Sequence, residues 1–574
     1  MTTGTSAHSG RWASVAVLCA AALVAVADIG TVPLDAHEIY VVGTAREMHA
    51  RHDWLIPYFE GRPRLNKPPL SYWATRLASS LDPSRRGIRD WHGRLPSALA
   101  AVGLCLVTML MARRLFEARS AVLSGLVLST TVGYYTYAHD ARPDMLYAFW
   151  CGAGLVGFLV ARDASDANRS TLRGALVMWV GYGLATLTKG PQMPATFVVA
   201  TGAYCVMRRM GWRTTVRIHR PVTGLLVVGL MTLPWWIALH LALGGDGLRG
   251  TQLAGSLFTS PHERALEFYY VFRPLKFLLP WALLIPVVPW VLLQDLRTSA
   301  ALQFLTAVVV IPVVLLSAGP HHRVHYVLPC LGAASILLAR AGLFVTDRVR
   351  DQAALPRAPR QTGQRILQRI LAWAPPVHWI GIAGVAIALG FVADRAGPAT
   401  RTRAILTLAM LGALGPVVFH PRVRVAAVTQ LGLLFVVALV GLGGAEPLWS
   451  RRRAESVELG RLVRQQIEPA TPVMVLGGGR VAIGHYAGRR LRQAKVLRDI
   501  VETMHAARDT PLAAIVPRRS LRSLPPDIAV TRVPARPTRR QRRRVLVLLR
   551  AREGERRCVR PAHEYDRGPD PDRT

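Results

Sequence analysis

The sequence predicts an all-α polytopic membrane domain followed by a small soluble α/β domain. Hydrophobic residues make up 51% of the 574 residues, yet the chain also carries 71 Lys and Arg against 34 Asp and Glu. These facts are compatible because apolar runs alternate with short basic loops along the chain. Each spanning helix needs roughly 20 mostly apolar residues, so this segregation is typical of a multi-pass membrane protein.

Apolar runs of spanning length predict about thirteen transmembrane helices in a membrane domain of residues 1–445. The first run could also be read as a cleaved signal peptide, but a retained anchor is favoured because many spans follow it. The runs lie at 12–33, 95–112, 120–138, 145–161, 174–188, 192–207, 221–243, 274–293, 299–318, 326–345, 377–393, 403–419 and 425–443.

The basic residues predict the orientation. The formal net charge is +37, but Lys and Arg lie mainly in short loops between the apolar runs, so no nucleic-acid partner is expected. Cytoplasmic loops of membrane proteins carry an excess of Lys and Arg. Their distribution predicts a cytoplasmic N-terminus in the inner (plasma) membrane, with the loop 34–94 on the extracytoplasmic side.

An odd number of spans then predicts that the C-terminal region is extracytoplasmic. Residues 446–551 read as a small α/β domain, because amphipathic helices near 455–466 and 497–507 alternate with short apolar strands. Residues 552–574 are polar and contain proline, so we expect a disordered tail.

Two carboxylates open the first outside loop. Asp35 and Glu38 are three residues apart, and His37 and Tyr40 lie beside them. A partly desolvated carboxylate here can act as a general base toward an acceptor hydroxyl. Alternatively, Asp35 caps a helix that begins near His37, with Glu38 as its capping-box partner. One residue can do both.

A lysine followed by two prolines lies farther along this loop. Proline stiffens the backbone, so Lys67 is held at a defined place, where its ammonium would suit a phosphate head group. The alternative is a snorkelling lysine beside the aromatic belt residues Tyr72 and Trp73.

Four further polar segments fall on the same predicted side of the membrane, and this convergence predicts one site. A divalent metal ion bound by Asp35, His37 and Glu38, with His139 or Asp144, is a second possibility, although the spacing matches no dedicated metal motif. Asp144 could contribute a second catalytic acid, or it could cap the helix that begins there. The candidate residues in these segments are Arg142, Asp144, Lys189, His262, Arg264, Tyr269, His325 and Tyr326.

The motifs of these segments resemble those of the GT-C glycosyltransferases that include lipid A aminoarabinose transferases and protein O-mannosyltransferases. The resemblance covers roughly residues 12–345. The first loop reads D-x-H-E-x-Y, A-R-E-M, D-W-x-x-P and K-P-P-L-x-Y-W, and later segments read R-P-D-M, L-T-K-G-P, P-W-W and H-Y-V-L-P.

The resemblance implies an inverting transfer from a polyprenyl-phosphate sugar to a hydroxyl of a lipid, glycan or protein acceptor. It implies that the first-loop acid is the base, that Lys67 contacts the donor phosphate, and that Asp144 matches an acidic position of the second loop. Relatives commonly carry adjacent Asp and Glu where this chain has His37 and Glu38, so Asp35 and Glu38 both remain candidates for the base.

Two other functions are compatible with many spans. A transporter or flippase of lipid-linked sugars would place ionisable groups near the bilayer midplane, whereas the apolar runs here are nearly free of charge. A catalytically inactive scaffold is the other alternative.

Overall fold

The computed structural model describes residues 3–84, 87–245, 269–318, 323–353, 451–507, 511–526, 528–533 and 544–551. The chain divides into two compact units, Met1–Arg451 and Arg452–Thr574. The predicted spans at 377–393, 403–419 and 425–443 and the predicted tail at 552–574 lie outside the described residues.

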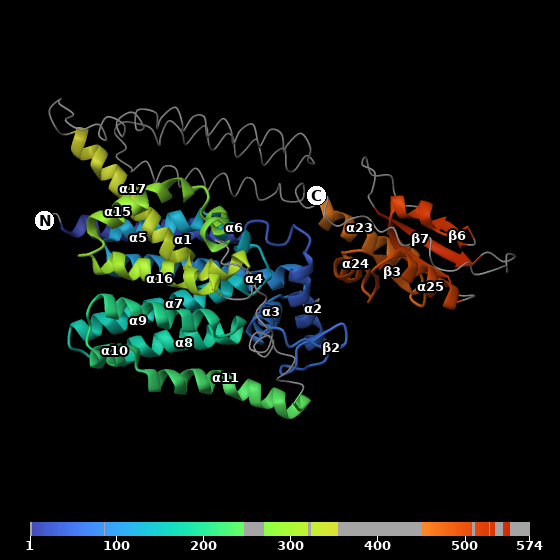
Figure 1. Ribbon diagram of the computed structural model, residues 1–574, viewed down its shortest axis with the longest axis horizontal. Helices are drawn as coiled ribbons and strands as arrows, with labels where there is room; N and C mark the ends of the chain where they lie inside the picture. The colour runs from blue at the N-terminus through green and yellow to red at the C-terminus, as the bar shows by residue number, and fades with distance from the viewer. Residues whose placement is uncertain are drawn as a thin grey trace. The chain divides into compact units, whose positions relative to one another are not determined.

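The described part of the first unit is helical apart from one short hairpin, and its long helices run side by side (Figure 1). The long helices are α1 (Thr3–Val26), α4 (Asp90–Leu115), α7 (Asp144–Asp166), α8 (Leu172–Lys189), α9 (Gln192–Met207), α11 (Pro221–Leu243), α16 (Ala300–Ser317) and α17 (Leu331–Ala353). The shorter elements are α2 (Ala36–Ala50), β1 (Tyr58–Phe59), β2 (Arg62–Pro63), α3 (Leu70–Ser80), α5 (Ala118–Ser129), α6 (Val132–Ala138), α10 (Trp212–His219), α14 (Tyr269–Phe272), η1 (Arg273–Leu278), η2 (Trp281–Val287), α15 (Val288–Asp295) and η3 (Val324–Cys330).

Several of these helices are suited to a bilayer. Among the described residues, five helical stretches are long and apolar enough to cross a membrane: Asp90–Leu115, Asp144–Asp166, Trp212–Leu243, Ala300–Ser317 and Val324–Val345. This confirms the helical, multi-pass character predicted from the apolar runs, while the number of spans stays a prediction.

Two predicted spans are interrupted. The run at 120–138 breaks into α5 and α6, because the hydroxyls of Thr130 and Thr131 donate to Leu126 O at 2.6 Å and to Leu128 O at 2.8 Å. The Thr131 hydroxyl then accepts from Tyr134 N at 3.1 Å and caps α6. Such local bonds compete with helix continuation.

The run at 274–293 is also not one helix. It forms the 3-10 turns η1 and η2 and then the short helix α15. Four prolines cause this, because proline cannot donate the backbone bond of a helix interior; they are Pro274, Pro280, Pro286 and Pro289.

Helices α7 and α8 pack closely through small residues. A Cβ on Gly157 would lie 2.3 Å from Met178 N, and one on Gly174 would lie 2.3 Å from Ala161 N. Only glycine therefore allows this backbone approach, as in many membrane helix pairs. Because the helices are consecutive and antiparallel, Asp144 at the start of α7 and Lys189 at the end of α8 lie at the same end of the pair.

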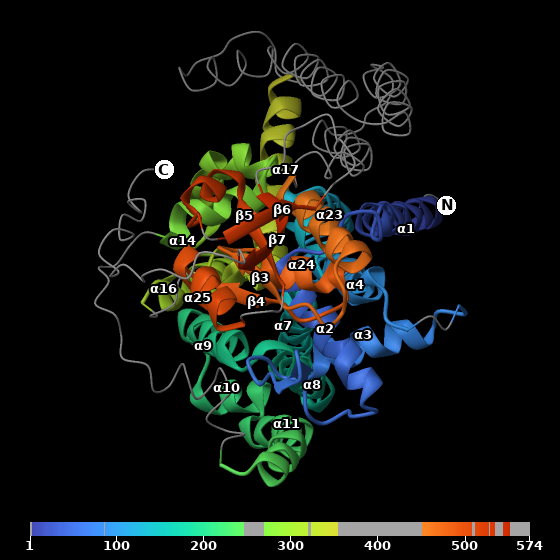
Figure 2. The same cartoon turned by 90° about the vertical axis from the view of Figure 1, so that its right-hand side faces the viewer.

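The second unit is a five-stranded sheet in the order β4-β3-β5-β7-β6, with β4, β3 and β5 parallel and β7 and β6 antiparallel. Helices cover both of its faces (Figure 2). Its elements are α23 (Arg451–Gln466), β3 (Val473–Leu476), α24 (Arg480–Ala487), β4 (Arg492–Ala494), α25 (Leu497–Ala507), β5 (Leu512–Pro517), η4 (Arg518–Ser523), β6 (Ile528–Arg532) and β7 (Arg544–Ala551).

The central strands explain the two covered faces. In β5, Ala513 and Ile515 pack with α23 and α24, while Leu512 and Ala514 pack with α25. Side chains alternate between the faces of a strand, so a strand buried on both faces must be apolar at every position. The continuous apolar run of β5 meets this requirement.

Candidate active site

Asp35 begins helix α2 as its N-cap. The Asp35 Oδ1 atom accepts from His37 N at 2.7 Å and from Glu38 N at 2.9 Å, and Glu38 Oε2 accepts from Asp35 N at 2.8 Å. This reciprocal pair is a capping box, which satisfies helix N–H groups that lack partners within the helix. Capping fixes the carboxylate of Asp35, which remains half-buried.

Glu38 is locked into a buried ion pair with Arg94 of α4. Arg94 Nε and one terminal nitrogen donate to the two Glu38 carboxylate oxygens at 2.6 and 3.0 Å, and the two residues are only 2% and 1% exposed. The same guanidinium donates to Val32 O at 2.7 Å. A buried charge needs such pairing, because its desolvation is otherwise costly.

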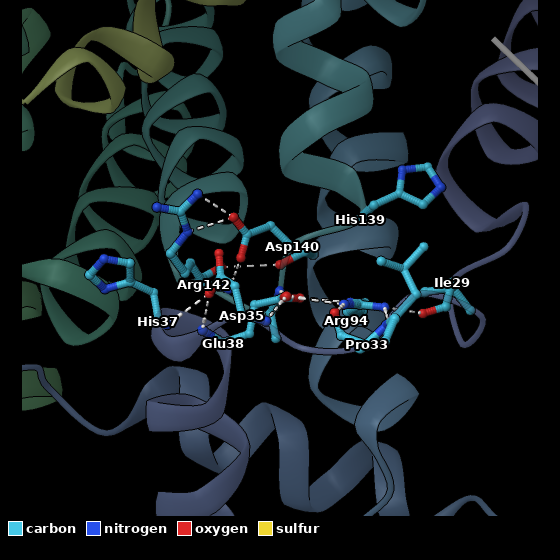
Figure 3. A network of polar contacts seen from close by, with 12 residues as sticks. Ile29, Pro33, Asp35, His37, Glu38, Arg94, His139, Asp140 and Arg142 are labelled. Atoms are coloured by element: carbon cyan, nitrogen blue, oxygen red, sulfur yellow. Dashed lines mark hydrogen bonds and ion pairs between the residues drawn. The ribbon is translucent and has the colours of Figure 1, made fainter. Parts of the chain in front are cut away.

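Glu38 also holds the second loop in place. Its Oε1 atom accepts from Ala141 N at 3.1 Å. One buried carboxylate therefore joins the α2 N-terminus, α4 and the segment before α7 (Figure 3). The sequence prediction did not include Arg94, because 56 residues separate the two partners.

Asp140 lies in that second loop and pairs with Arg142. Arg142 Nε donates to Asp140 Oδ2 at 2.5 Å, and Arg142 N donates to Asp140 Oδ1 at 3.1 Å. Burial raises the pKa of Asp140 to about 7; Arg142 opposes this shift, and the carboxylates of Glu38 and Asp35 add to it. Figure 3 shows Asp35 beside the Asp140 and Arg142 pair. The sequence prediction selected Arg142 but not Asp140.

Asp144 and Lys189 form a second buried ion pair at the same end of α7 and α8. Their side chains are 3% and 8% exposed, and the Lys189 ammonium bonds directly to Asp144 Oδ1. His325 Nε2 of η3 lies 4.0 Å from the same oxygen, and the Lys189 ammonium lies 4.8 Å from the centre of the Tyr326 ring. The structure thus brings together four predicted residues from three segments.

Tyr147 supports this pair from one turn farther along α7. Its hydroxyl donates to Gly190 O at 3.0 Å and accepts from Met193 N at 3.0 Å. These bonds hold the turn that carries Lys189. No motif in the sequence pointed to Tyr147, since it is one aromatic residue within an apolar run.

Lys67 is close enough to this pair to interact with it electrostatically. Burial lowers the pKa of Lys67 to about 8, the cations of Lys189 and Arg64 lower it further, and Asp144 opposes them. Lys67 is half-buried. The guanidinium of Arg64 lies 4.2 Å from the centre of the Tyr40 ring, so Tyr40 also borders the cationic region.

Other predicted residues lie apart from these contacts. His37 is exposed, and Figure 3 shows its ring directed away from Arg94. His262 and Arg264 lie outside the described residues, and Tyr269 is described only as the first residue of α14.

The structure does not gather the residues suggested for a metal. Both ring nitrogens of His139 face backbone carbonyl oxygens, Tyr135 O at 2.8 Å and Ala27 O at 2.7 Å, so neither points to a metal position. Within the described ranges, no group of three or more His, Cys, Asp or Glu side chains is placed to hold a metal ion.

Comparison with known proteins identifies relatives of this chain. A family model described as dolichyl-phosphate-mannose-protein mannosyltransferase matches residues 66–238. The chain is 26% identical, over 54% of its own length and 56% of the relative, to the undecaprenyl phosphate-alpha-4-amino-4-deoxy-L-arabinose arabinosyl transferase of Aeromonas salmonicida. A Pseudomonas fluorescens protein with the same activity in its name is 27% identical over 59% of this chain and 60% of that protein. The chain thus spans little more than half the length of these curated relatives.

A solved structure matches over more of the chain. The crystal structure of ArnT from Cupriavidus metallidurans bound to undecaprenyl phosphate superposes with a TM-score of 0.67 at 22% identity, covering 96% of this chain and 98% of that chain. At this identity the match shows a shared fold.

Proposed function

We propose that this chain is a GT-C glycosyltransferase that transfers a sugar from a polyprenyl-phosphate donor to an acceptor hydroxyl. The observation that carries the proposal is the convergence of cations and carboxylates at one end of the helices. Lys67, Arg142 and Lys189 come from three separate segments and meet Asp35, Asp140 and Asp144. This combination suits a reaction in which a hydroxyl loses a proton and a phosphate departs.

The cations would bind the donor phosphate. Lys67 is held at a pKa of about 8 by burial and by the neighbouring Lys189, so part of its positive charge is lost near neutral pH. The negative charge of a bound phosphate would stabilise the protonated lysine and so raise the pKa of Lys67. Lys67 would then stabilise the charge that develops on the phosphate as the bond to the sugar breaks.

Asp35 is the better candidate for the base. Four N–H groups donate to the carboxylate of Glu38, two from Arg94 and one each from Asp35 and Ala141, and this carboxylate is buried. Protonating Glu38 would break a buried ion pair, which is costly. Asp35 is half-buried, and its backbone is fixed by the capping box.

The reaction would be a single displacement with inversion. The acceptor oxygen attacks the anomeric carbon and transfers its proton to Asp35, while the bond between that carbon and the phosphate oxygen breaks. Polyprenyl phosphate leaves with the electron pair. The relatives named above act on undecaprenyl-phosphate aminoarabinose, which makes undecaprenyl-phosphate sugars the first donors to test.

Asp144 was predicted as a catalytic acid, and its contacts support a positioning role instead. It is 3% exposed and bonds to the Lys189 ammonium. Lys189 in turn lies over the Tyr326 ring. Asp144 would therefore hold Lys189 toward the donor phosphate. The orientation predicted from the basic loops would put this site, and the second unit, on the extracytoplasmic side.

The proposal can be tested with the purified full chain and a panel of polyprenyl-phosphate sugars, by measuring released polyprenyl phosphate. Lys67→Met should lower turnover by about 100-fold or more, because it removes the positive charge that would stabilise the departing phosphate. Lys276→Met removes an exposed lysine and serves as the matched control. Wild-type turnover in Lys67→Met would refute the assignment, and movement of intact donor across vesicles without release of polyprenyl phosphate would indicate a flippase.

A further inference from the structure

A cavity of about 400 Å³ lies at the other end of the helices from the candidate active site. Its polar lining comes from Arg114 at the end of α4, Arg162 and Asp166 at the end of α7, and Tyr204 and Arg208 at the end of α9. Its volume falls in the range of small-ligand sites. None of these residues takes part in the proposed transfer.

The length of helix α7 gives the separation between the candidate active site and the cavity. It begins at Asp144 and ends at Asp166, 22 residues later by their numbers. At 1.5 Å per residue this is roughly 33 Å, about the thickness of the hydrocarbon core of a bilayer. The cavity therefore opens at the opposite membrane surface from the transfer site. Figure 1 shows α10, which follows α9, at one end of this unit and α2 and α3 at the other.

The cavity carries anchored arginines. Two nitrogens of Arg162 donate to Asp163 Oδ1 at 2.5 and 3.1 Å, and a third lies 3.4 Å from the Tyr204 hydroxyl. Arg114 donates to Asp163 Oδ2 at 2.9 Å. One carboxylate thus orders two guanidinium groups, and Arg208 adds an exposed third. Three arginines against Asp163 and Asp166 leave an excess of positive charge.

An independent feature lies beside the cavity. The corner between α9 and α10 exposes three large apolar side chains: Val206 at 75%, Met207 at 46% and Trp212 at 79%. They flank Arg208 and Arg209 in the chain. Exposed apolar residues next to arginines are typical of a segment that lies in the membrane interface, with the cations at the level of the lipid phosphates.

We propose that this cavity binds the phosphate head group of an anionic phospholipid in the leaflet opposite the transfer site. Arginine is the residue best suited to this, because its planar fork donates two parallel bonds to phosphate oxygens. The acyl chains would lie against the exposed apolar residues of the α9 corner. The basic loops predict that this end is cytoplasmic, where anionic lipids make the membrane surface negative.

The test is lipid binding to the purified full chain in detergent, measured by native mass spectrometry with phosphatidylglycerol and phosphatidylcholine. The wild-type chain should retain phosphatidylglycerol in preference to phosphatidylcholine. The double variant Arg114→Gln with Arg208→Gln should lose at least about tenfold in affinity for phosphatidylglycerol, because two charge-assisted contacts are removed. Arg162 is left intact, because it is largely buried against Asp163.

The matched control is Arg169→Gln with Arg173→Gln, which removes the same charge from two exposed positions outside the cavity lining, one between α7 and α8 and one at the start of α8. Arg208→Glu alone provides a second cavity variant at an exposed position, in case the double variant does not fold. Wild-type melting temperature and transfer activity would show that the variants are intact.

Three results would overturn the proposal. Equal losses in the cavity and control variants would indicate diffuse electrostatic attraction. Equal retention of both lipids would show that the head group is not recognised. Displacement of phosphatidylglycerol by inorganic phosphate at the same concentration would indicate a site for free phosphate. Selective loss in the cavity variants, without such displacement, supports the lipid site.

Discussion

Two buried ion pairs lie in the candidate active site, and they differ in how completely they are satisfied. Glu38 receives four N–H groups, and Arg94 grips it through two nitrogens. Asp144 and Lys189 meet through a single oxygen, and the ammonium also faces the rings of Tyr147 and Tyr326. We call the first pair the Glu38–Arg94 clamp, because more contacts hold it. The second pair is the one that we propose to act on the donor phosphate.

The largest expected effect comes from breaking the clamp. Arg94→Met should destabilise the chain by about 3–5 kcal/mol, because it leaves the buried Glu38 carboxylate without its cation. The thermal unfolding midpoint in detergent would measure this. Arg119→Met, which removes one partner of the exposed pair with Asp347, should cost less than about 1 kcal/mol. Similar midpoints for the two variants would refute the clamp.

The next effect separates the base from the clamp. Asp35→Asn should lower turnover by about 10²- to 10⁴-fold, because asparagine cannot accept the proton. Stability should change little, since asparagine also caps helices. Glu38→Gln should instead lower the unfolding midpoint. The assignment of the base fails if Asp35→Asn turns over normally.

The second ion pair should behave differently from the clamp when both charges are removed. Lys189→Met alone leaves Asp144 buried and unneutralised, so both stability and turnover should fall. Adding Asp144→Asn should restore stability to within about 1 kcal/mol of wild type, while turnover stays at least about tenfold low. Recovery of turnover in the double variant would show that Lys189 has no role toward the donor.

The smallest effect is a pH dependence of donor affinity. Lys67 has a pKa of about 8, below its usual value of 10.5, so it loses its proton as the pH rises through 8. The KM for the donor should then rise several-fold between about pH 7 and 9. In Lys67→Arg, whose side chain stays charged, the KM for the donor should change little over this pH range. A KM that is independent of pH in the wild-type chain would contradict the assignment.

The lowered pKa of Lys67 also affects the stability of the folded chain, which should rise with pH while donor affinity falls. Between pH 8 and 10.5 the unfolded chain binds more protons at Lys67 than the folded chain does, since its folded pKa is the lower one. This residue therefore contributes stability that increases as the pH rises through that window. Deprotonation of Lys67 would thus not unfold the chain above pH 8, so it could not weaken donor binding in that way.

Local patterns in the sequence were enough to predict several features. The helical, membrane-spanning fold follows from apolar runs of spanning length, because the bilayer sets the length of each helix. The capping box of Asp35 and Glu38 is a contact over three residues, so its spacing is visible in the sequence. The sequence also predicted that the polar segments with Lys67, Asp144 and Lys189 converge; in the structure Asp144 pairs with Lys189, and Lys67 interacts electrostatically with both.

Only the tertiary structure decided the partners of these groups. Arg94 meets Glu38 across 56 positions, and Asp144 meets Lys189 across 45. Such pairs depend on which helices pack together. Helices α7 and α8 approach closely because positions 157 and 174 are glycines. Long-range packing also paired Glu38 with Arg94 and brought Asp140 close to Asp35 and Glu38. The sequence by itself determined which segments are polar, and packing decided which charges are satisfied and which remain available for chemistry.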